Sequence, residues 1–289
     1  MTPKYDKLSL LATYVFNNRL EDYKKNLMCL VTDGYRFVSV NESLNAIGNN
    51  KEKIICLRHD VDYSSPATVA MAEIEFKLGI KATYYFRHST KERDVLNKLK
   101  KMGHEISLHY ETLADMYKLH YLSNVDINDE EFKAKYIDMM KDEINRFRMD
   151  FDVECRTIAA HGAPENRLLN IPNNYIFLNL QKDINIKIYE YLDVDLEAYD
   201  CQYLSEWDAY LSDVPVEINN GWRYELTPGD ILRRKISRAI ILTHPNHWKY
   251  NFGKRAKKII KILISNNQIK SDEFYYQSFL RGVASHEIE

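Results

Sequence analysis

The stretch Lys53-Ile-Ile-Cys-Leu-Arg-His-Asp-Val-Asp62 decides the fold of this chain, because an apolar, β-branched run ends abruptly in charged residues. Successive side chains of an extended strand point to opposite faces, so Arg58, Asp60 and Asp62 share one face. Burying two carboxylates and a guanidinium at a strand tip is costly unless a partner such as a divalent cation compensates them. The alternative interpretation is an ordinary aspartate-rich turn that closes the strand.

Strand and helix patterns alternate outward from this stretch, which predicts a parallel sheet or barrel. The further strands are expected at residues 35–40, 80–86, 104–109, 157–160, 175–180 and 239–243. The helices are expected at residues 20–33, 66–78, 94–102, 129–149 and 254–264. We expect one domain over residues 1–289, with N-terminal helices and the first strand in 1–50. Residues 170–230 show no clear period and are expected to form loops over the site.

The composition is that of a globular protein, with 289 residues of which 45% are hydrophobic. Lys and Arg total 40 against 42 for Asp and Glu, and this balance argues against nucleic acid or an anionic membrane as the main partner. The four cysteines lack metal-type spacing, which favours free thiols in a reducing compartment. The first residues lack a signal-peptide pattern and no run approaches ~20 apolar residues, so we expect a cytoplasmic protein without a membrane span.

Three further apolar strands also end in histidine. Residues 103–111 place His109 at a strand end, residues 157–165 place His161 there, and residues 240–248 place His244 before a proline that keeps its backbone extended. The carboxyl ends of parallel strands meet at one edge, so these histidines are expected near the aspartates. Imidazole and carboxylate groups together are typical zinc ligands, whereas one strand-end histidine alone is more often simply hydrogen-bonded.

The order of these motifs resembles the polysaccharide deacetylase superfamily, also known as the NodB homology domain or carbohydrate esterase family 4. It is most similar to the branch whose first motif is Arg-His-Asp-Val-Asp, which is linked to surface-polysaccharide biosynthesis. The resemblance covers most of the chain, from Gly34 to His244. It implies a distorted parallel (β/α) barrel of the NodB type with about seven strands, a divalent metal ion that is typically Zn²⁺, and a carbohydrate substrate.

The resemblance also implies roles for single residues. The first motif of that superfamily holds a general base and a metal ligand, which implies Asp60 as the base and Asp62 as a ligand. The second motif matches residues 103–109 and implies His109 as another ligand, and the final Leu-x-His motif implies His244 as the general acid. Arg58 either keeps the neighbouring base ionised or forms a structural ion pair beneath the site.

The chain departs from the family pattern in three places. Leu113 occupies the position of the family's second histidine, and Val61 separates two aspartates that are usually adjacent. A His-Gly-Ala-Pro sequence stands where the family usually has an arginine before proline. The third metal ligand must therefore come from elsewhere, and we favour His161, with Glu111 and then His104 as alternatives.

These assignments predict a metal-dependent hydrolase that removes an N-acetyl group from an amino sugar or a polysaccharide precursor. Two alternatives stay open: hydrolysis of another C–N bond, in an imide or a formamide, and a degenerate, non-catalytic sugar-binding protein of polysaccharide assembly. Trp222, Trp248 and the tyrosines of residues 199–210 either stack on a sugar ring or pack in the interior.

Overall fold

The computed structural model describes residues 19–46, 52–63, 66–120, 129–182, 186–214, 221–223 and 226–249. The strands in this part of the chain are β1 (Arg36–Val38), β2 (Ile54–Val61), β3 (Thr83–Phe86), β4 (Glu105–Tyr110), β5 (Thr157–Ala160), β6 (Leu196–Glu197), β7 (Ala209–Ser212) and β8 (Arg238–Thr243). The larger helices are α2 (Leu20–Thr32), α4 (Pro66–Lys77), α5 (Arg93–Lys101), α7 (Glu130–Phe151), α9 (Asn173–Gln181) and α12 (Pro228–Arg234). The shorter ones are α3 (Val40–Ala46), α6 (Thr112–Lys118), α8 (Pro164–Leu169), α10 (Ile188–Leu192), α11 (Cys201–Ser205) and the 3₁₀ turn η2 (Pro245–His247). The helix expected at residues 254–264 lies outside the described residues.

The eight strands form one parallel sheet, which confirms the expected distorted (β/α) barrel. Seven strands follow the order β6-β5-β4-β3-β2-β8-β7, and β1 is an eighth that pairs with β2 outside this order. Among the described residues no ladder joins β6 to β7, so the barrel is open between them. Every strand pair is parallel, and the carboxyl ends of the strands therefore lie at one end of the barrel.

The central position of β2 explains both its composition and the distortion of the barrel. All eight of its residues are buried, as its continuous apolar run predicts for a strand covered on both faces. Along one edge, β1 pairs with the first three residues of β2 and β3 pairs with the last four, while β8 occupies the other edge. Two short strands thus share one edge of a longer strand.

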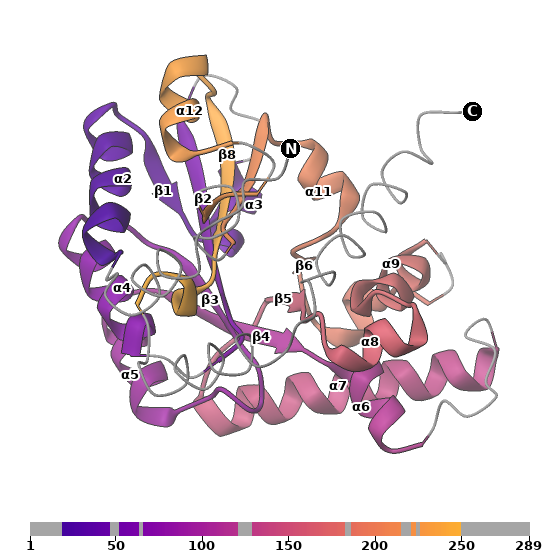
Figure 1. The fold of residues 1–289 in the computed structure, drawn as a ribbon. Coiled ribbons are helices and arrows are strands. Elements are labelled where there is room, and N and C mark those ends of the chain that lie inside the picture. The colour runs from indigo at the N-terminus through magenta and orange to yellow at the C-terminus, as the bar shows by residue number, and fades with distance from the viewer. Residues whose placement is uncertain are drawn as a thin grey trace, which may run out of the picture.

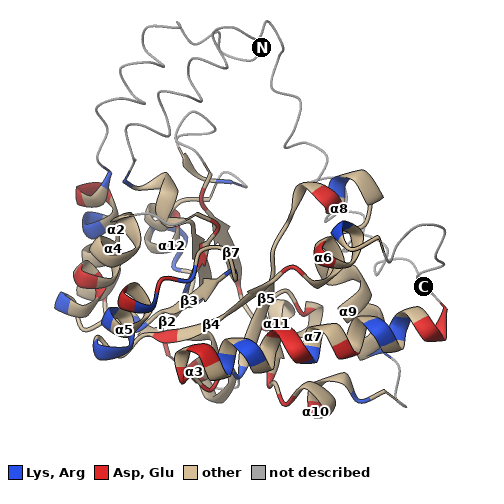
Figure 2. Cartoon of the chain, turned by 90° about the horizontal axis from the view of Figure 1, so that it is seen from below, with Lys and Arg blue, Asp and Glu red and all other residues tan. Residues whose placement is uncertain are grey.

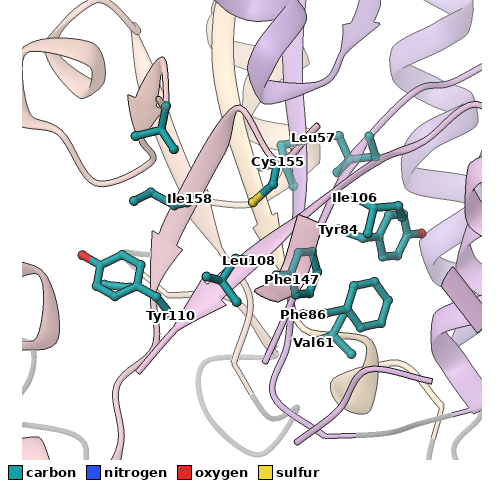
Figure 3. Close-up of a cluster of buried hydrophobic side chains, with 14 of the residues drawn as sticks. Leu57, Val61, Tyr84, Phe86, Ile106, Leu108, Tyr110, Phe147, Cys155 and Ile158 are labelled. Carbon is teal, nitrogen blue, oxygen red and sulfur yellow. The ribbon is translucent and has the colours of Figure 1, made fainter. Parts of the chain in front are cut away.

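The two faces of the sheet carry different cores. The outer face packs on the helices through a large apolar cluster, whose members in Figure 3 include Leu57 and Val61 of β2, Phe86 of β3 and Phe147 of α7. The inner face carries a smaller cluster around Cys56, together with Arg58 and Asp60, which share the face of Cys56 along β2. The alternation of side chains along β2 therefore directs the charged residues into the barrel, as expected.

Helices cover the outside of the sheet in two groups. Figure 1 shows α2, α4 and α5 on one side and α6 to α9 on the other. The exposed faces of these helices carry charges of both signs, most clearly along α7 (Figure 2). None of the helices in the described part of the chain combines the length and the apolar character that spanning a membrane requires.

Most elements before residue 160 agree with the sequence-based expectation, but the second half of the chain corrects it. The strand predicted at residues 175–180 is wrong, because this segment lies in the helix α9. The buried residues of α9 include Ile176, Phe177 and Leu180, which is helical spacing rather than strand alternation. Residues 170–230 are also not a loop region, since they contain α9, α10, α11 and the strands β6 and β7.

A buried carboxylate, Glu75 of α4, organises a polar network on the outer face of the sheet. Its oxygens accept hydrogen bonds from the hydroxyls of Tyr23, at 2.6 Å, and Tyr84, at 2.9 Å. His59 Nε2 lies 3.2 Å from Glu75 Oε1, and His104 Nδ1 lies 3.7 Å from Glu75 Oε2. The network joins α2, α4, β2, β3 and the start of β4, so it ties the helical layer to the sheet.

We expect Glu75→Ala to lower the free energy of unfolding by about 3–5 kcal/mol, because buried donors would lose their shared acceptor. Urea denaturation followed by far-ultraviolet circular dichroism measures this loss. The matched control is Glu73→Ala on the exposed face of the same helix, for which we expect a change of less than about 0.5 kcal/mol. Equal stability of the two variants would contradict a stabilising role for the network.

Candidate metal and catalytic site

The sequence-predicted site residues come together at the carboxyl ends of four strands. Asp60 lies in β2 and Asp62 directly follows it, His109 lies near the end of β4, and His161 and His244 directly follow β5 and β8. The ring centroids of the imidazoles of His109 and His161 are 5.0 Å apart. This is the end of a parallel barrel at which loops and strand tips usually build active sites.

Asp62, His109 and His161 form a cluster with the donor set of a metal site. Asp62 Oδ1 lies 3.3 Å from His109 Nε2 and 3.5 Å from His161 Nε2. One ligand atom from each of the three residues lies within 4.8 Å of the other two. One carboxylate and two imidazoles are the ligands of many catalytic zinc sites, in which a further position stays open for water or substrate.

The hydrogen bonds at Nδ1 of the two histidines fit a role as metal ligands. His109 Nδ1 lies 2.9 Å from the carbonyl oxygen of Ala159, to which it donates, and His161 Nδ1 donates to Glu111 Oε1 at 3.1 Å. Each Nδ1 therefore carries a proton, and each Nε2 faces the carboxylate of Asp62. Burial lowers the pKa of His161, which favours the neutral imidazole that binds metals. Such outer hydrogen bonds typically orient histidine ligands.

Glu111, the second candidate for the third ligand, supports His161 instead. Arg87 Nε and Nη2 donate to its two carboxylate oxygens at 2.9 and 2.8 Å. Burial alone would raise the pKa of Glu111, but its hydrogen bonds with His161 and Arg87 lower it to about 2. Arg87 also donates from Nη1 to the backbone carbonyl of Asp62 at 2.9 Å. Arg87 therefore connects the backbone of Asp62 to Glu111, the hydrogen-bond partner of His161.

His104, the last candidate for the third ligand, lies elsewhere. Its Nε2 is 3.3 Å from the carbonyl oxygen of Ala72 and its Nδ1 faces Glu75, on the outer face of the sheet. Leu113, at the position of the family's second histidine, is fully buried in the outer apolar core. Neither residue faces the cluster of Asp62.

Asp60 lies beside the cluster and is almost fully buried, with 1% of its surface exposed. Arg58 Nη2 donates to its two carboxylate oxygens at 2.9 and 3.1 Å, and His109 Nε2 lies 3.6 Å from Oδ2. Burial alone would raise the pKa of Asp60, but the charges of Arg58, His109 and His244 hold it below its usual range. Asp60 is therefore ionised at neutral pH.

His244 reaches the cluster from the end of β8. Its Nε2 lies 3.9 Å from Asp62 Oδ2, and its Nδ1 donates to Asp213 Oδ1 at 2.7 Å. Burial disfavours the imidazolium, yet Asp213 raises the pKa of His244 to about 9. The protonated imidazole of His244 can therefore act as a proton donor near neutral pH.

Asp213 is a candidate site residue that the sequence analysis missed. It is fully buried directly after β7, where it also accepts hydrogen bonds from the backbone N–H of His244 and from Trp248 Nε1. It fell within the region expected to be loops. The apolar segment before it, which ends abruptly in this aspartate, is the signal that identifies it, by the same rule that identified Asp60.

The tryptophans proposed as sugar-stacking residues are packed in the interior. Trp248 is fully buried, and the guanidinium carbon of Arg19 lies 4.5 Å from its ring centre. Trp222 is also buried, and its ring packs edge-on against the ring of Trp248. Both belong to the outer apolar core. Neither offers an exposed ring face for a substrate.

Comparisons with known proteins return only distant similarities. No family model matches the chain, and no curated protein sequence matches it. A carbohydrate esterase family 4 pseudoenzyme from Bacillus anthracis is 13% identical, with a TM-score of 0.39 over 74% of this chain and 61% of that chain. A family 4 carbohydrate esterase from the same organism is 14% identical, with a TM-score of 0.38 over 86% and 88% of the two chains. A peptidoglycan deacetylase from Bacillus subtilis is 14% identical, with a TM-score of 0.36 over 74% and 98%.

The similar structures thus include proteins described as a carbohydrate esterase, a deacetylase and a pseudoenzyme. This chain spans about three fifths of the pseudoenzyme chain, 61% of its length.

Proposed function

We propose that the protein is a metal-dependent hydrolase that removes an N-acetyl group from an amino sugar or a polysaccharide precursor. One observation carries this proposal: a carboxylate–histidine–histidine cluster lies within 4 Å of a buried aspartate paired with arginine and of a histidine paired with a second buried aspartate. Amide hydrolysis needs a group that accepts a proton from water and a group that protonates the leaving nitrogen. Asp60 and His244 are these two groups.

The residues of the cluster fit a divalent ion, which we propose to be Zn²⁺ held by Asp62, His109 and His161. When bound, such an ion polarises the substrate carbonyl and makes water more acidic. The chain's own residues prepare the site for it, because Glu111 and the carbonyl of Ala159 fix the orientation of both imidazoles. The ligand set therefore does not need the histidine that Leu113 replaces.

Asp60 acts as the general base in this proposal. Its carboxylate accepts a proton from the attacking water, and the oxygen of that water forms a bond to the acetamido carbon. Arg58 keeps the carboxylate ionised, because its guanidinium is buried against Asp60. The guanidinium is itself held by a hydrogen bond from Nη1 to the backbone oxygen of Ala198 at 3.1 Å.

His244 acts as the general acid. An amine anion is too basic to leave, so the C–N bond breaks as Nε2 of the imidazolium transfers its proton to the nitrogen. Asp213 holds the other ring nitrogen and stabilises the imidazolium. The products are acetate and a free amino sugar.

Several finer assignments belong to the same proposal. The Arg-His-Asp-Val-Asp motif supports a substrate from surface-polysaccharide biosynthesis, and the four free cysteines support a location in a reducing compartment such as the cytoplasm. We also propose that the chain works as a single deacetylase domain. The closed, hydrogen-bonded catalytic groups favour an enzyme over a degenerate sugar-binding protein, because a binding protein has no need for a buried imidazolium–carboxylate pair.

The test is metal-dependent acetate release. Purified protein is incubated with N-acetyl amino sugars in free, nucleotide-linked and oligosaccharide form, before and after removal of metal with a chelator. We expect acetate release that the chelator abolishes and added Zn²⁺ restores. Release of formate from N-formyl sugars, without acetate release, would favour the other C–N hydrolase. Protein that binds no stoichiometric metal and releases neither acid would contradict an enzymatic function.

A further inference from the structure

The contact between Arg58 and Asp60 does not by itself fix the carboxylate. Both hydrogen bonds come from a single nitrogen, Nη2, and Nη1 donates instead to the backbone of Ala198. A two-nitrogen fork defines the plane of a carboxylate, whereas one shared nitrogen leaves the carboxylate free to rotate about its bond to Cβ. A base must present a defined oxygen to water, so a second donor is needed.

Tyr199 supplies this second donor. Its hydroxyl donates to Asp60 Oδ2 at 2.9 Å, and its ring centre lies 4.5 Å from the guanidinium carbon of Arg58. The ring of Tyr85 lies on the same guanidinium at 4.9 Å. We propose that Tyr199 is a positioning residue for the general base, which fixes the rotation of the Asp60 carboxylate and covers its counter-ion Arg58.

The segment that carries Tyr199 is itself held in place. The backbone N–H of Tyr199 donates to Glu197 Oε2 at 2.8 Å, and the other oxygen of Glu197 accepts from the backbone N–H of Ala160 at 3.0 Å. Ala160 directly precedes His161, so Glu197 connects the tip of β6 to the strand that carries a proposed metal ligand. The backbone of Tyr199 is therefore held in place relative to β5 by the Glu197 carboxylate.

The hydroxyl of Tyr199 stays protonated and available as a donor. Burial raises the pKa of Tyr199 well above its usual value, and the charge of Asp60 raises it further. Tyr199 is thus a permanent donor to a carboxylate that must only accept. Because it follows β6, which the sequence did not reveal as a strand, the sequence indicated Tyr199 only as one of the aromatic residues of 199–210, and not as a partner of Asp60.

The inference rests on the proposed function, and Tyr199→Phe tests it by removing the hydroxyl while keeping the ring over Arg58. We expect kcat for acetate release to fall about tenfold, which corresponds to about 1.4 kcal/mol. We expect KM to change by less than about twofold, since the hydroxyl acts on the base and not on substrate binding. Metal content should match that of the unaltered protein.

Tyr203→Phe is the matched control. Tyr203 is another buried tyrosine of the same region, and its hydroxyl contacts Ser43 Oγ at 2.9 Å and Cys56 Sγ at 3.4 Å inside the barrel. We expect this variant to keep kcat within about twofold, because its hydroxyl orients no reacting group. An unchanged kcat in Tyr199→Phe, or an equal loss in both variants, would overturn the inference.

Two further measurements keep the test decisive. If Tyr199→Phe does not fold, Tyr199→Met fills the same space without a hydroxyl and takes its place with the same expected loss. A crystal structure of the folded variant should show the Asp60 carboxylate rotated from its position in the unaltered protein. A rotated carboxylate in a protein without deacetylase activity supports the positioning role and contradicts the proposed function. An active protein whose variant keeps both carboxylate position and kcat contradicts the positioning role alone.

Discussion

Asp60→Asn is expected to lower kcat for acetate release by about 10³-fold, within the 10²–10⁴-fold range of general acid–base catalysis. The asparagine amide has nearly the same size as the carboxylate, but it cannot accept a proton from water at neutral pH. One of its two ends is also an NH₂ group, which faces a donor from either Arg58 or Tyr199. Steady-state kinetics together with metal analysis by mass spectrometry measure the effect.

Metal content separates loss of the base from loss of the site. Asp60 is not a member of the Asp62 cluster, so the variant should retain stoichiometric metal. Asp22→Asn, on the exposed face of α2, is the control for a general effect of removing a carboxylate and should keep full activity. Full activity of Asp60→Asn would refute Asp60 as the base, and loss of metal would reassign it to the metal site.

His161→Ala is expected to weaken Zn²⁺ binding by more than about 100-fold, which exceeds the usual loss for a hydrogen-bond partner of a ligand. The variant removes one of the three ligand atoms and leaves Glu111 paired with Arg87. Competition with a chromophoric zinc chelator at fixed pH measures the affinity. Acetate release should be lost in parallel at limiting zinc.

His104→Ala is the matched control, because His104 is also a buried histidine beside a carboxylate but lies on the outer face of the sheet. It should lower the stability of the fold and leave zinc affinity unchanged. Weakened zinc binding in His104→Ala, with normal binding in His161→Ala, would reverse the assignment of the third ligand.

The sequence predicted the elements that build the carboxyl end of the barrel, because their signals are local. The alternation along β2 directs Arg58 and Asp60 inward as expected, and the helix expected at residues 129–149 is α7. The error at residues 175–180 has a physical cause. A short apolar run between polar residues fits a strand or a helix equally, and only packing against neighbouring helices decides between them.

The residues at the strand tips could be predicted from the sequence, but the residues that hold them in place by hydrogen bonds could not. Four strand tips with acidic or histidine residues are visible in a sequence, and the structure brings Asp62, His109, His161 and His244 to one place. The supporting groups come from positions whose partners are distant in the chain. Tyr199 and Asp60 are 139 residues apart, and His161 and Glu111 are 50 residues apart, so no local pattern connects them.

The single residue between the two aspartates has a consequence for how this site can vary. Val61 packs into the outer core while its neighbours on either side turn inward. In this chain, an insertion or deletion of one residue at this point would change which face of the strand the following carboxylate occupies. Asp62 would then be directed toward the apolar layer beneath the helices, away from His109 and His161. A single-residue spacer is therefore what keeps both carboxylates of this chain on the inner face.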